Sequence, residues 1–342
     1  MQCDVVIVGA GPVGLEVAAA LQADGLHTLV LDAGAIGQTI ASLFPTQTRF
    51  FSSPERLEIG GVAMALPNQE KPTGEAYLAY LRSVVQTLDL QVRTFERVVD
   101  CAGTKGDFTI HTETHAGGRS TLQAKHVVLA VGGTQHSRTL GVEGEDLPHV
   151  HRLLGDPHRF FQRRVLVVGG KNSAVESALR CWRIGAHVTL ACRGETLHNR
   201  VKYWLRPEVS ALLDEGQITP RLHTAVQRIH MDHVELLDMH TGATECIPVD
   251  DVLLQLGFEA DSSTLQLFGL ALHGEANAPV FNVDTMESSI PGVFVAGTAT
   301  AGSQRSYKVY IETSHVHAAK IAAAIAGRQT PTMPAPRVLP ES

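Results

Sequence analysis

The chain has 342 residues, of which 44% are hydrophobic and 18% charged, a composition typical of a folded globular protein with room for two domains. Its 28 basic and 35 acidic residues give a formal net charge of −7 with no basic run, so we expect no nucleic acid among its partners. No apolar stretch approaches the roughly 18 residues of a membrane span, and the five cysteines are odd in number and include no CxxC. We therefore expect a protein of the reducing cytoplasm, without a signal peptide or membrane contact.

The first predicted elements form a strand, a glycine-rich turn, a helix and a second strand. Residues 4–8 are a short β-branched run, and the turn 9–14 follows directly. An alanine-rich helix extends to about Asp24, and the second strand, 28–32, ends in Asp32. Continuous β-branched runs of this length are typical of buried parallel strands.

The turn has the spacing of a dinucleotide-binding loop. In such a loop Gly9 permits the tight turn, Gly11 lets the backbone approach a pyrophosphate, and Gly14 allows close helix–strand contact. The helix N-terminus then holds the phosphates, and Asp32 accepts hydrogen bonds from a ribose diol. The glycine spacing alone also occurs in ordinary turns, but its position between a strand and a helix, with an acid 23 residues after Gly9, predicts a dinucleotide site.

The same order of elements returns later in the chain. Residues 164–168 are the strand, 169–174 the turn, 173–184 the helix and 187–192 the second strand. Arg193 then occupies the place that Asp32 has in the first copy. Two copies predict two nucleotide-binding domains.

The second copy differs from the first at two positions that bear on nucleotide choice. Lys171 stands where a glycine is usual, and Arg193 replaces the ribose-binding acid. A guanidinium pairs with a 2′-phosphate that an acid would repel, so Arg193 favours NADPH over NADH. The alternative is an arginine that merely faces solvent at a strand end. Arg200, Lys202 and Arg206 add positive charge nearby if they face the nucleotide. The alternative for them too is that they merely face solvent.

Each copy closes with another buried strand, 126–133 in the first and 251–258 in the second. A last strand, 292–297, and a C-terminal helix over about 311–326 follow the second copy, which indicates that it is inserted into the first. Apolar and polar residues alternate weakly over 91–124, which predicts a small antiparallel meander.

The predicted fold is α/β, with two nested Rossmann-like dinucleotide-binding domains. We expect an FAD-binding domain over 1–157 plus 284–330 and an NADPH-binding domain over 158–283. Residues 331–342 form a proline-rich tail.

The histidines and cysteines give no metal or disulfide motif. Of 17 histidines none forms an HExxH motif, and His315 and His317 lie two apart on a predicted helix and so on different faces. We therefore expect no metal site. Cys181 and Cys192 fall in a helix and a strand and are interpreted as small core residues, and nothing near Cys3 would activate it.

From residue 4 to about 326 the chain resembles the thioredoxin-reductase-like flavoproteins, and within them the bacillithiol disulfide reductases of the YpdA type. The segments that carry the resemblance are PTQTRFFSSPERLEIG (45–60), GVEGEDLPHV (141–150), VVGGKNSAVESAL (167–179), RGETLHNRVKYWLRPE (193–208) and FNVDTMESSIPGVFVAGTATAG (281–302). The resemblance implies a thioredoxin-reductase-like, three-layer ββα fold, bound FAD, NADPH as donor, and a homodimer or homotetramer.

The resemblance also implies which residues hold each cofactor. The FAD site would comprise Gly9, Gly11, Pro12, Val13, Gly14, Asp32, Ala33, Gly34, Gln38, Thr39, Ile40, Val99 (near the adenine), Ala130, Gly132, Gly297, Thr298 and the helix start Ile311–Thr313 (at the pyrimidine end). The NADPH site would comprise Gly169, Gly170, Lys171, Asn172, Ser173, Arg193 and Lys202.

One departure bears on the chemistry. The YpdA group has a cysteine immediately before the third glycine of the first loop, and this chain has Val13 there. A cysteine at a helix N-terminus would be a reactive thiolate, which valine cannot replace. We therefore predict no thiol relay through the protein and assign no catalytic side chain, since the flavin carries the chemistry.

The leading functional hypothesis is an NADPH-dependent FAD oxidoreductase, with hydride passing from NADPH to flavin N5 and electrons then passing to a low-molecular-weight disulfide such as that of bacillithiol. The alternative acceptors are ferredoxin or flavodoxin, a quinone, or oxygen. A third hypothesis is a redox-sensing flavoprotein that binds NADPH without turnover. A domain rotation about hinges near 155–160 and 280–285, with Gly155 and Pro157 in the first, would bring nicotinamide and flavin together.

Overall fold

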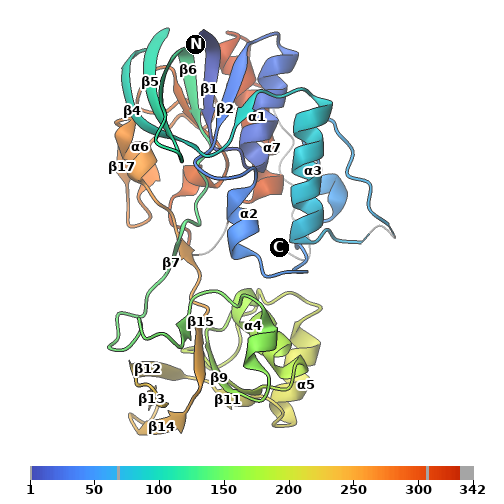
Figure 1. Cartoon of the computed structure of the whole chain (residues 1–342), viewed down its shortest axis with the longest axis vertical. Coiled ribbons are helices and arrows are strands. Elements are labelled where there is room, and N and C mark those ends of the chain that lie inside the picture. Colours follow the sequence, from blue (N-terminus) through green and yellow to red (C-terminus); the bar gives the residue numbers. More distant parts are fainter. Residues whose placement is uncertain (1, 68–69, 306–307, 332–342) are drawn as a thin grey trace. The chain divides into compact units, whose positions relative to one another are not determined.

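The computed structural model describes residues 2–67, 70–305 and 308–331. They form two compact units: the first lies within Met1–His136 and Phe258–Pro336, and Ser137–Gly257 form the second. A separate two-stranded sheet is formed by β7 (His136–Ser137) and β16 (Phe258–Glu259) (Figure 1). The predicted tail lies, from residue 332 onward, outside the described residues.

These boundaries differ from the predicted ones, 157/158 and 283/284. Residues 137–157 belong to the second unit because β8 (Val150–His151) is an edge strand of its sheet. Residues 258–283 belong to the first unit because Leu265 and Phe268 are buried in a core cluster of that unit. Gly155 and Pro157, the predicted hinge, thus lie inside the second unit.

The first unit is built on a seven-stranded sheet in the order β3-β2-β1-β6-β5-β4, with β19 also paired to β6. Its parallel part comprises β1 (Gln2–Val8), β2 (Thr28–Leu31), β3 (Val92–Arg93), β6 (Arg119–Leu129) and β19 (Val293–Val295). Its antiparallel part joins β4 (Glu96–Thr104) and β5 (Asp107–Thr114) to β6, which confirms the predicted meander.

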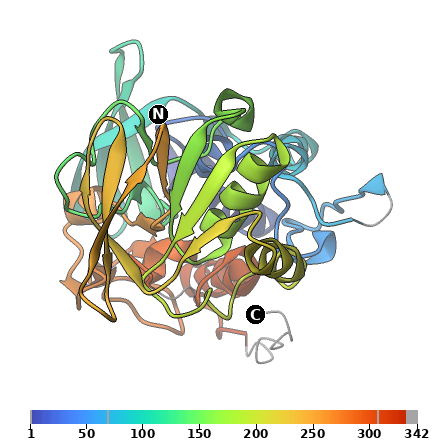
Figure 2. The same ribbon diagram turned by 90° about the horizontal axis from the view of Figure 1, so that it is seen from below.

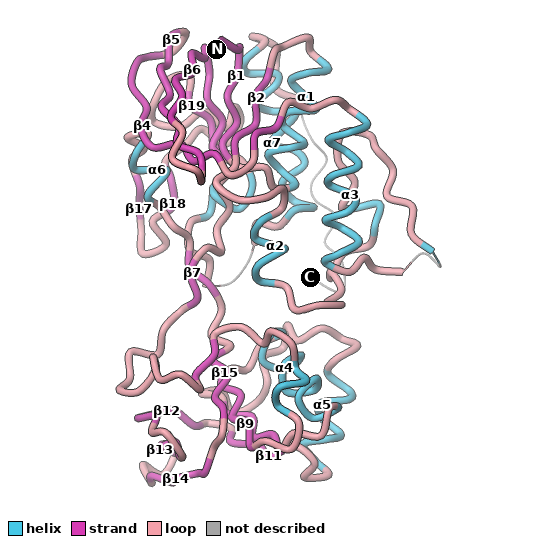
Figure 3. Tube along the Cα trace, viewed as in Figure 1, coloured by secondary structure: helices cyan, strands magenta, loops and turns pink. Residues whose placement is uncertain are grey.

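Helices cover one face of this sheet. They are α1 (Pro12–Ala23), α3 (Gly74–Thr87) and α7 (Ile311–Ile325), and their apolar side chains share one buried cluster with Val5 and Ile7 of β1. Figure 3 shows these helices on the side of the parallel strands away from β4 and β5. The remaining elements of the unit are α2 (Gln38–Leu43), η1 (Pro54–Arg56), α6 (Ser263–Leu267), β17 (Leu272–His273), β18 (Ala278–Pro279) and η4 (Gly297–Ala301).

The second unit repeats this layering on a smaller scale. Its five-stranded sheet has the order β11-β10-β9-β15-β8, with all pairs parallel. The bounds are β9 (Arg164–Val168), β10 (His187–Ala191), β11 (Thr219–Arg221) and β15 (Asp251–Leu254). α4 (Asn172–Arg183) and α5 (Arg206–Asp214) pack on one face (Figure 2), and η3 (Pro157–Phe160) precedes β9.

An antiparallel sheet of β12 (Thr224–Ile229), β13 (His233–Asp238) and β14 (Thr244–Pro248) packs on the other face of the second unit's parallel sheet. Val165 and Val167 of β9 contact the helices, while Leu166 and Val168 contact this antiparallel sheet. A strand buried on both faces needs a continuous apolar run, which is why RVLVV folds here as it does. None of the helices among the described residues is both long and apolar enough to span a membrane.

Candidate functional site

The three glycines of the turn after β1 have different surroundings. Gly9 has φ +113°, and a Cβ there would lie 2.4 Å from the Ala130 oxygen. A Cβ on Gly14 would lie 1.9 Å from the Gly9 oxygen, whereas one on Gly11 would meet nothing within 4 Å. Gly9 and Gly14 therefore let backbone segments approach each other. Gly11 instead faces open space at the start of α1.

That open space lies at the N-terminus of α1, a natural position for an anion. Gly11 is the N-cap residue and makes no side-chain cap, Pro12 begins the helix, and the first turn holds no acidic residue. The positive end of the helix dipole and its N–H groups are thus directed at whatever occupies the space.

Asp32 holds two turns in place around this helix start. One carboxylate oxygen accepts from the Ala10 N–H at 2.7 Å and the other from the Gly34 N–H at 2.7 Å. Burial raises the pKa of the Asp32 carboxyl. Each oxygen keeps further lone pairs, so the carboxylate can still accept from a diol.

The predicted residues after Asp32 gather in the same loop. Gln38 accepts from the Ala35 N–H at 2.9 Å, and a Cβ on Gly34 would lie 2.6 Å from the Gln38 side chain. Ala33 and Thr39 are exposed. The structure therefore brings Asp32, Gly34 and Gln38, three of the predicted FAD-site residues, together in one loop.

Two predicted residues lie further from that arrangement. Ile40 is buried in the core, 7% exposed. Val99 lies on β4, 40% exposed. Phe95 was missed by the sequence interpretation: it has φ +55°, is 48% exposed, and donates its N–H to the Gly34 oxygen at 3.0 Å. No sequence pattern marks it, because its position depends on the pairing of its backbone with the Asp32 loop.

The turn after β19 packs directly on Val13. Gly297 has φ +69°, and a Cβ there would lie 3.2 Å from the Val13 Cβ. A Cβ on Gly133, which follows Gly132, would lie 3.1 Å from the Thr298 oxygen. The structure thus brings the first glycine loop and the 132–133 turn each against the 297–298 turn, with the Val13 side chain buried against Gly297.

Two histidines of α7, the helix that Ile311 begins, are part of this region. The His317 Nδ1 accepts from the Gly297 N–H at 3.0 Å, and burial lowers the pKa of His317 to about 4. His317 is therefore neutral at pH 7, with its proton on Nε2. The sequence interpretation considered both histidines only as metal ligands.

His315 joins α7 to two other elements. Its Nδ1 lies 2.7 Å from the Glu16 carboxylate of α1, and its Nε2 lies 2.7 Å from the Arg56 oxygen of η1. Both partners are acceptors, so the doubly protonated ring satisfies both contacts, and the hydrogen bond to Glu16 raises the pKa of His315.

We expect His315→Gln to remove a stabilisation that depends on pH. The pKa of His315 is raised in the folded state, so its charged form stabilises the fold. This stabilisation is complete below the pKa of the unfolded state, about 6.5, and it is lost as the pH rises through the pKa of the folded state. The variant should lose about 1 kcal/mol of unfolding free energy at about pH 6 and much less at about pH 9. Urea unfolding at both pH values measures this difference. An equal loss at both would show that the imidazolium is not involved, and His111→Gln on β5 is the control.

The second glycine turn has the same construction in the second unit. Gly169 has φ +143°, and a Cβ there would lie 2.4 Å from the Gln255 oxygen. Lys171 is the N-cap residue of α4 without a side-chain cap, and the first turn, which includes exposed Ser173, holds no acid. A Cβ on Gly170 would lie 3.2 Å from the Cys192 Cβ.

Basic residues of the 198–206 segment gather around this turn. Asn172 accepts from the Lys202 N–H at 2.7 Å and donates to the Arg200 oxygen at 3.2 Å. The His198 N–H donates to the Gly170 oxygen at 2.9 Å. Burial lowers the pKa of His198, and three neighbouring cations add to the effect: Lys171, Arg200 and Arg206.

Arg193 and Lys202, two of the three basic residues predicted to contact the nucleotide, differ in their surroundings. Arg193 is exposed two residues after the end of β10. The Lys202 ammonium lies 3.8 Å from the Glu176 carboxylate and 5.4 Å from the centre of the Trp204 ring. Arg193 is thus the better placed of the two for a phosphate outside the protein.

The thiols of the described residues do not supply a replacement for the family cysteine. Burial raises the pKa of Cys101 to about 11 and of Cys181 to about 12, and it also raises the pKa values of Cys3 and Cys192. Cys246 is exposed on β14, on the antiparallel sheet of the second unit.

Two Rossmann-like units, each with a glycine turn at a helix N-terminus, define a class of oxidoreductases that bind two dinucleotides. The chain belongs to the pyridine nucleotide-disulphide oxidoreductase family, whose model matches residues 6–297. It is therefore an oxidoreductase.

Among curated proteins, the bacilliredoxin reductase Bdr of Bacillus subtilis (strain 168) is 35% identical over 327 residues, which cover 95% of this chain and 98% of that protein. The ferredoxin–NADP reductase of Ignicoccus hospitalis is 27% identical over 88% of this chain and 92% of that protein.

Among solved structures, the bacillithiol disulfide reductase Bdr (YpdA) of Bacillus cereus is 34% identical, with a TM-score of 0.89 over 96% of this chain and 100% of that chain. The thioredoxin reductase of T. acidophilum, 21% identical with a TM-score of 0.72 over 95% of this chain and 98% of that chain, shares the fold. The predicted thioredoxin-reductase-like fold is confirmed.

Proposed function

We propose that the chain is an NADPH-dependent FAD oxidoreductase that reduces a low-molecular-weight disulfide of the bacillithiol type. The observation that carries the proposal is the pair of glycine turns, one followed by Asp32 and the other by exposed Arg193. The bacillithiol disulfide reductase of Bacillus cereus, similar over 96% of this chain, supports the choice of acceptor.

The residues of the first unit fit FAD. The open space at Gly11 admits a pyrophosphate at the start of α1, and Asp32 can accept from the adenosine ribose. We assign the turns at Gly132 and Gly297 to the flavin side of the same site. When bound, the flavin takes a hydride from the nicotinamide and passes two electrons to the acceptor.

The residues of the second unit fit the 2′-phosphate of NADPH. Arg193 takes the place of a ribose-binding acid and can pair with a phosphate through two N–H groups. Lys171, Arg200 and Arg206 surround His198 beside the same turn and add positive charge. Asn172 holds the 200–202 backbone against the turn, so these groups keep a fixed position.

The overall reaction is NADPH + H⁺ + RSSR → NADP⁺ + 2 RSH. Val13 is buried against Gly297, and the four thiols with a raised pKa are poor nucleophiles. We therefore assign no part in the reaction to position 13 or to these four thiols, and we infer that the residues of the chain act by binding and orienting.

The test is anaerobic NADPH oxidation by the purified holoenzyme with bacillithiol disulfide. We expect disulfide-dependent turnover in the wild type. For Val13→Cys we expect a rate within about twofold of it: the α1 N-terminus favours a thiolate, but burial against Gly297 opposes it and shields the sulfur from the disulfide. Absence of turnover with the disulfide would refute the proposed acceptor. A large gain in the variant would show that the buried position supports a thiol relay.

A second candidate keeps the cofactors and changes the acceptor to ferredoxin or flavodoxin. The similarity to the ferredoxin–NADP reductase of Ignicoccus hospitalis, which extends over 88% of this chain, favours this acceptor. Ferredoxins are acidic, so the net charge of −7 makes the match weaker. NADPH-dependent reduction of ferredoxin, quinone or oxygen in place of the disulfide would support this group of acceptors, and flavin reduction without turnover would support the sensor hypothesis.

We also propose that the enzyme acts in the cytoplasm as a homodimer or homotetramer. Unpaired cysteines throughout the described residues are in keeping with a reducing compartment. Light scattering of the holoenzyme measures the assembly.

A further inference from the structure

A hairpin in the second unit carries two histidines and a glutamate, residue types that can bind metals, on one face. β12 and β13 are antiparallel, and the His230 N–H donates to the His233 oxygen at 2.9 Å, which closes the turn between them. Val234 and Leu236 of β13 are buried in the core. Because side chains alternate along a strand, His233 and Glu235 project from the opposite face, and His230 joins them from across the turn.

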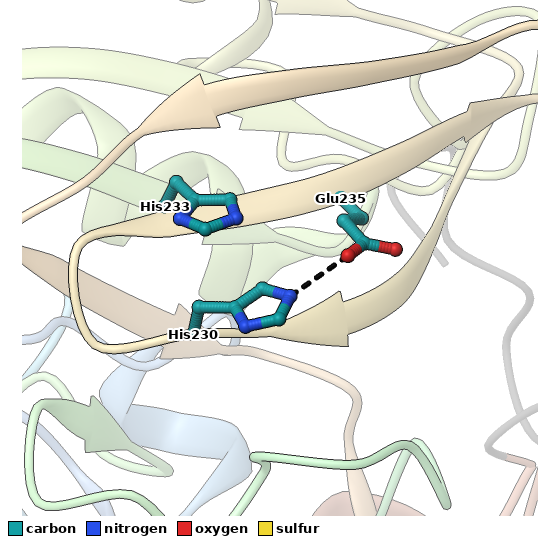
Figure 4. Close-up of side chains that lie close together, drawn as sticks. All are labelled: His230, His233 and Glu235. Carbon is teal, nitrogen blue, oxygen red and sulfur yellow. Dashed lines mark hydrogen bonds and ion pairs between the residues drawn. The ribbon is translucent and has the colours of Figure 1, made fainter.

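The three side chains already lie close together (Figure 4). One ligand atom from each of His230, His233 and Glu235 lies within 4.8 Å of the others. The His230 Nε2 is 2.8 Å from the Glu235 carboxylate, and the two imidazole rings stack with centres 4.2 Å apart. Ligand atoms around a tetrahedral zinc ion lie about 3.3 Å apart, given bonds of about 2.0 Å. Small side-chain rotations therefore suffice to bring the three atoms onto one ion.

Asp232 orients one of the three side chains, His233, through a hydrogen bond. Its carboxylate lies 2.7 Å from the His233 Nδ1. This contact places the His233 proton on Nδ1 and leaves Nε2 with a free lone pair for a metal. Metal-binding histidines are commonly oriented by such a carboxylate.

We propose that His230, His233 and Glu235 bind a divalent transition-metal ion of the zinc, nickel and copper class. Two imidazoles and one carboxylate suit these ions, whereas Mg²⁺ and Ca²⁺ prefer oxygen ligands. Three protein ligands leave a fourth position open for water or a second molecule. The ion would join the end of β12 to the start of β13 and stabilise the hairpin.

The surrounding charges favour a cation overall. Arg228 lies opposite Glu235 in the strand register and is a nearby positive charge. Its guanidinium forms an ion pair with the Glu143 carboxylate at 2.8 Å, which offsets that charge. Asp232 adds a negative charge behind His233. The ligands are also reachable, since the His230, His233 and Glu235 side chains are 33%, 36% and 28% exposed.

The test is calorimetric titration of the chelator-treated, FAD-loaded full chain with Zn²⁺. We expect one saturable site per chain, a loss of more than about tenfold in affinity for His230→Ala, and a loss of about tenfold for Asp232→Asn. Two controls should bind as the wild type does. His223→Ala changes a histidine at the other end of the hairpin, beside His240. Cys246→Ser removes the exposed thiol of the β14 residue that lies opposite Glu235 in the strand register.

A second measurement identifies the ligands directly. With Cu²⁺ in place of Zn²⁺, electron paramagnetic resonance should show coupling to two imidazole nitrogens in the wild type and to one in His230→Ala. Unchanged FAD content and thermal unfolding would show that the variant is folded. No saturable Zn²⁺ binding, equal affinity in His230→Ala, or loss of binding in Cys246→Ser would each overturn the three-ligand site.

Discussion

Replacing Gly14 by alanine is expected to unfold the first unit and abolish FAD binding. The new Cβ would lie 1.9 Å from the Gly9 oxygen, a backbone atom that cannot rotate away. Either α1 or the turn after β1 must shift, which costs about 3 kcal/mol or more. Thermal unfolding of the apoprotein and fluorescence titration with FAD measure the two losses.

Gly11→Ala is the matched control, because it distinguishes an effect on FAD binding from an effect on the stability of the fold. Gly11 has φ −80°, and a Cβ there meets nothing within 4 Å. The apoprotein should therefore unfold at the wild-type temperature, while affinity for FAD falls because the methyl group occupies the space assigned to the pyrophosphate. Wild-type FAD affinity in Gly11→Ala would show that the pyrophosphate binds elsewhere, and a stable Gly14→Ala would show that the turn can relax.

Replacing Arg193 by alanine is expected to weaken NADPH and leave NADH almost unchanged. A charged bidentate contact to the 2′-phosphate is worth about 1.5–3 kcal/mol, so the KM for NADPH should rise about 10- to 150-fold. NADH lacks this phosphate and loses nothing. Steady-state reduction with each nucleotide measures the ratio.

The control for this variant is Arg183→Ala, which removes an exposed arginine of α4 paired with Glu208. It should change neither KM. If Arg193→Ala weakens both nucleotides equally, Arg193 acts on a part that they share. If it weakens neither, one of the neighbouring cations, Arg200 or Arg206, holds the phosphate.

Local sequence was sufficient to predict the glycine turns and their helices. The roles of Gly9, Gly11 and Gly14 were predicted from a motif within a few residues. The structure gives Gly9 and Gly14 the close backbone contacts that the motif predicts, and it leaves space at Gly11. The buried strands were equally predictable, since RVLVV and DVVIV are apolar on both faces.

Contacts between distant residues were not predictable. His315 and Glu16 are 299 positions apart, and their pairing depends on α7 packing against α1. The domain boundaries differ for the same reason, because β8 has no apolar run and belongs to the second unit only through its pairing with β15. The cluster of His230, His233 and Glu235 depends on the register of β12 and β13.

The sequence by itself therefore determined the class of protein, the two nucleotide turns and the absence of a cysteine at position 13. The reason is that a glycine turn, a strand and a helix start are specified by neighbouring residues, whose backbone conformation depends on local sterics. Only the tertiary structure decided that Val13 is buried against Gly297, that His315 bridges α1 and η1, and that three hairpin side chains meet on one face. Those arrangements depend on packing and strand register, which no single segment contains.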